Sequence, residues 1–71
     1  MISIKELEME IEMENELAKD YNYMINKYKQ MIEDIGEDEE LFNTMLEYRS
    51  KLVNSLKRIG KLENKLRELK K

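Results

Sequence analysis

Apolar residues recur at helical spacing through almost the whole chain, in two stretches that meet at Gly36. In the first stretch the apolar positions lie alternately three and four residues apart, which is the spacing of a coiled-coil seam. The seam positions are Ile4, Leu7, Ile11, Glu14, Ala18, Tyr21, Ile25, Tyr28, Ile32 and Ile35. Glu14 is the one charge among them. We therefore predict an all-α protein whose first helix packs against another helix along this seam.

The second stretch carries a similar stripe. Its members are Leu41, Met45, Tyr48, Leu52, Leu56, Ile59, Leu62, Leu66 and Leu69, with Phe42, Leu46 and Val53 widening it near the start. This pattern predicts a second long helix. Gly60 lies inside it and leaves two alternatives open, a break in the helix or a close approach of another backbone.

Signals for the helix ends are clear. Ser3 followed by Glu6 forms a capping box, so the first helix should begin at Ile4, although residues 7–14 alternate as a strand does. Gly36 can adopt the left-handed conformation that ends a helix, and Asp38 can cap the next one. We predict helices over residues 4–35 and 39–70, joined by a turn at 36–38.

Two long helices joined by so short a turn should fold back on each other, giving a single antiparallel, coiled-coil-like hairpin domain over residues 1–71. Charge favours the same arrangement. Residues 1–40 hold four basic and thirteen acidic side chains, whereas residues 41–71 hold nine basic and three acidic ones. In the predicted register, facing residue numbers sum to about 74. Glu14 would then face Gly60, within reach of Arg58 or Lys61.

The first helix carries more apolar surface than one partner helix can cover. A second row, the methionine row, should lie roughly 120 to 160° around the helix from the seam. Its members are Met9, Met13, Leu17, Met24 and Met31. We expect this row to be an interface, either the core of a homodimeric four-helix bundle, which symmetric oligomers favour, or an adaptable surface for another protein.

Composition argues against several chemistries. The chain has 71 residues, no cysteine and no histidine, so disulfides and thiolate or imidazole metal ligands are excluded. Acidic residues near the turn miss the EF-hand spacing, and a two-helix hairpin offers no cleft for paired carboxylates. We predict no catalytic, cofactor or metal site. The chain has no apolar run long enough to span a membrane, and we expect a cytoplasmic protein.

Two groups of exposed residues remain as candidate contacts. The first could recognise a partner protein and comprises Ile2, Glu8, Glu12, Glu16 and Tyr23. The second, Lys57, Lys61 and Lys65, could follow phosphates. The net charge of −3 and the acidic first helix disfavour nucleic acid. We therefore expect a small non-enzymatic protein–protein interaction module acting as an adaptor, inhibitor or assembly factor. The alternatives are a nucleic-acid-binding regulator and a purely structural, self-assembling scaffold.

Overall fold

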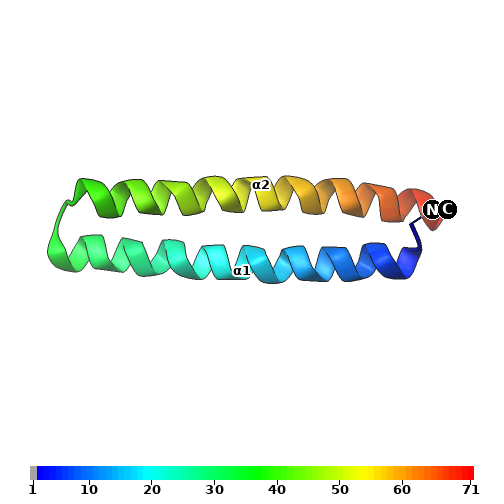
Figure 1. Cartoon of the computed structure of the whole chain (residues 1–71), viewed down its shortest axis with the longest axis horizontal. Helices are drawn as coiled ribbons and strands as arrows, with labels where there is room; N and C mark the ends of the chain where they lie inside the picture. Colours follow the sequence, from blue (N-terminus) through cyan, green and yellow to red (C-terminus); the bar gives the residue numbers. More distant parts are fainter. Residues whose placement is uncertain (1) are drawn as a thin grey trace.

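The computed structural model describes residues 2–71 as a helical hairpin (Figure 1). Helix α1 spans Ile4–Ile35 and helix α2 spans Glu39–Leu69, and residues 2–71 contain no strand. The turn brings the two ends of the chain to the same end of the rod. The predicted all-α hairpin is thus confirmed. Helix α2 ends one residue earlier than predicted, at Leu69, and the Lys70 N–H still donates to the Leu66 carbonyl.

The helix ends follow the capping residues. The Ser3 hydroxyl accepts a hydrogen bond from the Glu6 N–H at 3.1 Å, which satisfies a donor that has no partner within the helix. Asp38 does the same for α2, because its Oδ1 accepts from the N–H groups of Glu40 and Leu41. Gly36 ends α1 with φ of 100° and ψ of −175°. Its φ is positive as predicted, but its extended ψ takes it out of the left-handed helical region.

The predicted seam of α1 faces α2 along most of its length. Leu7 is fully buried, and the positions from Ile11 to Ile32 are half-buried. The two end positions differ, since Ile4 and Ile35 are both exposed. Ile35 lies beside the turn, where α2 has only begun, so no opposing residue covers it. The seam therefore runs effectively from Leu7 to Ile32.

The seam of α2 differs from the predicted stripe at two positions. Leu69, the last predicted position, is 45% exposed at the end of the helix, and Leu56 lies outside the seam. Ser55 is fully buried, whereas Leu56 is 54% exposed. A strict alternation of three- and four-residue steps passes through Leu52, Ser55 and Ile59, and it leaves Leu56 on a flank. The prediction followed the leucine because it is apolar. The periodicity instead places the serine in the core.

Tyrosine rings fill the middle of the hairpin, as predicted for seam positions. The Tyr48 ring lies 5.9 Å from the Tyr28 ring in a stacked arrangement and 6.3 Å from the Tyr21 ring in a tilted one. The cation near these rings is Lys51, whose Nζ lies 5.3 Å from the Tyr48 ring centroid. Such offset and tilted contacts suit the ring quadrupoles and fix the two helices relative to each other.

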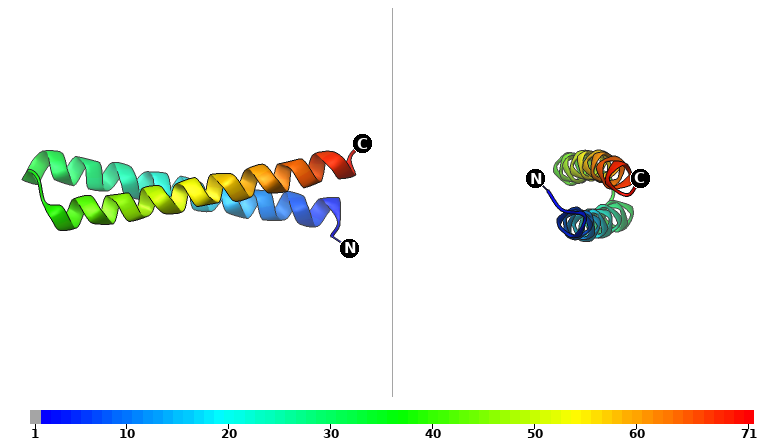
Figure 2. Two further views of the ribbon diagram at one scale, coloured as in Figure 1. Left: turned by 90° about the horizontal axis from the view of Figure 1, so that it is seen from above. Right: turned by 90° about the vertical axis from the view of Figure 1, so that its right-hand side faces the viewer.

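Each helix has only one neighbour, so the molecule is a rod (Figure 2). It measures 51 × 16 × 14 Å, and its radius of gyration is 16.0 Å, against about 11 Å for a compact domain of this length. Helix α2 continues through Gly60 without a break, and no atom from another part of the chain lies within 4 Å of where the Cβ of this residue would be. The predicted break at this glycine is therefore wrong, and within the chain no other backbone approaches it.

Candidate interaction surfaces

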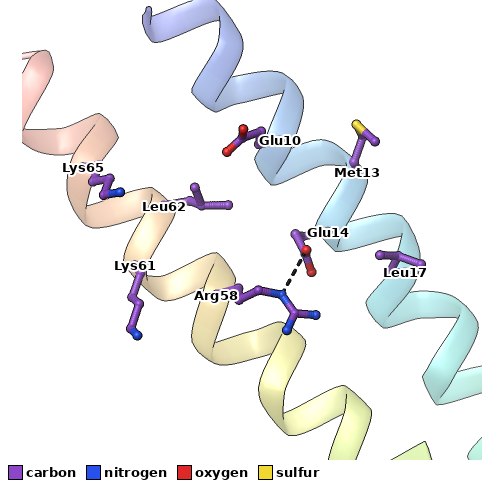
Figure 3. A pocket seen from close by; sticks show the side chains of 8 residues that line it. All are labelled: Glu10, Met13, Glu14, Leu17, Arg58, Lys61, Leu62 and Lys65. Carbon is purple, nitrogen blue, oxygen red and sulfur yellow. Dashed lines mark hydrogen bonds and ion pairs between the residues drawn. The ribbon is translucent and has the colours of Figure 1, made fainter. Parts of the chain in front are cut away.

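A polar layer interrupts the apolar seam about a third of the way along α1. The Ser55 hydroxyl donates to Glu14 Oε2 at 2.8 Å and lies 3.3 Å from the Glu14 carbonyl oxygen. Arg58 Nε donates to Glu14 Oε1 at 3.0 Å (Figure 3). Glu14 therefore faces Ser55 and Arg58 and does not face Gly60. The predicted contact with Arg58 is confirmed.

These contacts hold Glu14 in its ionised form. Its side chain is only 19% exposed, and burial alone would raise its pKa. The hydrogen bond from Arg58 and then that from Ser55 outweigh burial, and together with the arginine's charge they lower the pKa of Glu14 below its ordinary value of 4.5. An ionised group with defined partners in a seam favours one register over others. The polar layer thus serves alignment of the two helices.

The basic arm of α2 lies beside acidic residues, but it forms few direct ion pairs. In residues 2–71 the one ion pair that joins the two helices is Glu14–Arg58. Lys61 and Lys65 line an open hollow of about 340 Å³ together with Glu10 and Glu14, and Lys61 points away from α1 (Figure 3). Carboxylates in the same hollow offset the attraction of these lysines for a phosphate. Lys57 is exposed and does not line the hollow.

The methionine row divides into two parts. Met9 and Met13 are exposed, Met13 by 66%, and Leu17 is 41% exposed. Met24 and Met31 are half-buried, so they lie closer to the seam than the predicted 120 to 160°. They occur at seven-residue intervals after Leu17, on the flank next to the seam positions Tyr21 and Tyr28. We call Met13, Leu17, Met24 and Met31 the α1 strip.

The residues predicted to recognise a partner are all exposed. Ile2 and Glu8 lie near the start of α1, and Tyr23, 67% exposed, lies halfway along it. Glu12 and Glu16 line an open hollow with Leu66 of α2 that does not include Met13 or Leu17. These residues therefore do not form one patch with the α1 strip.

A second apolar surface, only partly anticipated from the sequence, lies on α2. Phe42, Leu46, Val53 and Leu56, which we call the α2 strip, are between 42% and 54% exposed. Leu56 and Arg58 are two residues apart, so they point in nearly opposite directions around the helix, about 200° apart. Arg58 lines the hollow that also contains Met13 and Leu17. The α1 strip and the α2 strip thus lie on opposite sides of the hairpin.

Other kinds of site find no support in the described part of the chain. Residues 2–71 contain no group of three or more acidic side chains placed to hold a metal ion. No helix within that range is long and apolar enough to cross a bilayer. Comparison with models of protein families, with curated proteins and with solved structures finds no match. The surfaces described above are therefore the basis for any proposal about function.

Proposed function

We propose that the hairpin is a small non-enzymatic protein–protein interaction module, which acts as an adaptor, inhibitor or assembly factor by offering helical faces to other chains. Association between copies of the chain belongs to the same proposal, with the methionine row as one of the contacts. The hollows between the helices are open, whereas acid–base catalysis uses concave sites that exclude water.

The observation that carries this proposal is the imbalance between buried and exposed apolar side chains. Among residues 2–71, three apolar side chains are buried and twelve large ones are exposed. The accessible surface is 5796 Å², whereas a compact monomer of this mass exposes about 4700 Å². Contiguous exposed apolar residues on a small protein mark surfaces that another chain covers.

Charge around the N-terminal part of α1 suits a basic partner. Glu8, Glu12 and Glu16 are exposed on the same helix as Met9 and Met13, and although they line a different hollow from Met13, their field extends over this end of the hairpin. A negative field around an apolar contact accelerates encounter with a positively charged surface and is screened by salt. We therefore propose that a partner of this end of the hairpin carries basic residues around an apolar patch.

The second candidate function is a structural scaffold that assembles only with itself. The presence of apolar strips on opposite sides of the hairpin favours it, because each copy could then contact two others. Nucleic-acid binding through Lys57, Lys61 and Lys65 remains the weaker alternative. A mobility-shift measurement at low salt tests it, and a shift that these lysines control would favour it over the protein-binding proposal.

A double variant of α1 tests the proposal. Replacing Met9 and Met13 by glutamate should leave helix content unchanged, since both side chains are exposed, and should weaken capture of a host protein by about 1 kcal/mol or more. The matched control, Asn22→Glu with Asn26→Glu, adds the same two charges at exposed polar positions of α1. Circular dichroism reports folding, and quantitative pull-down from the native host reports binding. Equal loss in both variants would contradict a role for these methionines.

A further inference from the structure

Each helix carries a second heptad seam besides the one that joins α1 to α2. Around the α1 strip, steps of four and three residues run through Met13, Leu17, Asp20, Met24, Lys27 and Met31. Around the α2 strip the same steps run through Phe42, Leu46, Arg49, Val53, Leu56 and Gly60. This spacing is the pattern by which a helix packs against a further helix in a left-handed supercoil. The two seams are therefore suited to helical partners.

The placement of the two seams restricts how copies can associate. In a closed four-helix bundle with a two-fold axis along the rod, both helices would present the same side of the hairpin to the second copy. On the side of the α1 strip, however, Leu62 is the one apolar residue of α2 in the hollow that contains Met13 and Leu17. The residues that flank the seam of α2 on this side are polar by helical spacing, namely Thr44, Glu47, Lys51, Asn54, Arg58 and Lys61. Such a bundle would pack methionines against charges and leave the α2 strip uncovered.

We propose that the α1 strip of one copy packs antiparallel against the α2 strip of a second copy, in the register that joins α1 to α2 within the chain. This inference rests on the proposed interaction function and names its partner as another copy of the same chain. Because the two strips face opposite ways, the contact is heterologous and repeats from copy to copy. It closes only if the copies form a ring.

The side chains of the two strips are complementary in this register. Within the hairpin, the residue numbers of interacting side chains sum to between 69 and 76. Sums in this range place Leu17 of one copy against Leu56 of the next copy, and Met31 against Phe42 of the next copy. They also place Met13 against Gly60, where no atom occupies the space within 4 Å of a would-be Cβ. Because Gly60 has no side chain, the methionine could approach the backbone of α2 closely there.

One pair of charges within the seams, Asp20 and Arg49, is complementary as well, whereas Lys27 falls near the same arginine as a like charge. The numbers of Asp20 and Arg49 sum to 69, as do those of Tyr21 and Tyr48. Within the hairpin the two tyrosine rings are 6.3 Å apart, so the proposed register brings Asp20 of one copy similarly near Arg49 of the next. In residues 2–71 neither Asp20 nor Arg49 has an opposite charge within 4 Å. An Asp20–Arg49 pair would satisfy both groups and would specify the register. Pairing two identical strips offers no such match for Arg49.

One-sided variants test the arrangement. Met13→Glu with Leu17→Glu disables the α1 strip, and Leu46→Glu with Leu56→Glu disables the α2 strip; all four side chains are exposed, so the hairpin should still fold. By analytical ultracentrifugation, the natural chain should exceed two copies as its concentration rises. Each variant alone should associate about a hundredfold more weakly. An equimolar mixture should form a heterodimer that stops at two, because one working strip of each kind remains.

Other results would overturn the proposal. Homodimers of the variant with the disabled α2 strip would show that α1 strips pair with each other, and homodimers of the other variant would show the same for α2 strips. A natural chain that stays monomeric at every concentration would exclude a second copy as the partner. If that monomer still captures a host protein in a Met13-dependent way, the interaction function stands and only the present inference fails.

A charge exchange tests the register independently. Asp20→Arg should weaken self-association about tenfold or more, because the new arginine then meets Arg49 across the contact. Arg49→Asp should weaken it less, because the new aspartate meets Asp20 but also lies near Lys27. Mixing the two variants should restore it, since every junction in an alternating assembly regains one acid and one base. Failure of the mixture to recover, while each variant remains helical, would refute the proposed register.

Discussion

Replacing Gly60 by alanine should stabilise the hairpin. Gly60 lies inside α2 at an exposed position, and no heavy atom lies within 4 Å of where a Cβ would stand. The added methyl group therefore meets no clash within the chain. Glycine in a helix interior costs about 0.5–1 kcal/mol relative to alanine, because its backbone loses more conformational freedom on folding.

The whole of this difference should appear in the free energy of unfolding, since no contact within the chain opposes it. For a domain of 60–100 residues, 1 kcal/mol raises the melting temperature by about 4–8 °C. We expect a rise of about 2–8 °C for Gly60→Ala. Thermal unfolding followed by circular dichroism at high dilution measures it, because dilution separates the stability of one hairpin from association between copies.

The matched control is Lys57→Ala. Lys57 is an exposed residue of the same helix, and its helix propensity is close to that of alanine, so the change should stay within about 0.5 kcal/mol. A melting temperature for Gly60→Ala that equals or falls below that of the natural chain would refute the reasoning. It would mean that α2 bends at Gly60 or that another backbone approaches there.

Two further substitutions test the packing and the polar layer. Ile59→Ala should lower the free energy of unfolding by about 2 kcal/mol or more, because Ile59 is buried in the seam. Leu56→Ala should lower it much less at high dilution, because Leu56 is exposed. Urea denaturation measures both, and equal losses would contradict the placement of these residues. Glu14→Gln should destabilise the protein near neutral pH. Because Arg58 and then Ser55 lower the folded-state pKa of Glu14, its contribution is present above the unfolded pKa and is lost as pH falls through the folded value. The difference from the natural chain should therefore shrink below about pH 4.5, and a gap that persists under acid would contradict this role.

Local signals predicted most of the fold. Ser3 and Asp38 cap the helices as their sequence context indicated, and the spacing of apolar residues from Leu7 to Ile32 identified the face of α1 that meets α2. These features depend on neighbouring residues or on a periodicity of the chain. The short turn then left the hairpin as the natural arrangement of two such helices.

Long-range contacts account for what the sequence did not predict. Ser55 is buried at its heptad position, and Glu14 across the seam accepts the hydrogen bond of its hydroxyl; neither residue alone indicates that pairing. Strict heptad spacing predicts Ser55 at the seam position between Leu52 and Ile59. The prediction chose Leu56 for this position because leucine is apolar. The α2 strip was anticipated only as a widening of the seam near the turn. The α2 strip is separate from the seam because Leu56 lies on the flank and Ser55 takes the seam position.

Methionine methyl resonances test most directly whether the exposed strips are the interaction surface. The chain can be labelled at the methionine methyl groups and observed by NMR from about 10 µM to about 1 mM. If the α1 strip associates, the signals of Met13, Met24 and Met31 should shift with concentration. The signal of Met45, which is buried inside the hairpin, should stay in place. Signals that all remain unchanged over this range, and on addition of a captured host protein, would contradict the account.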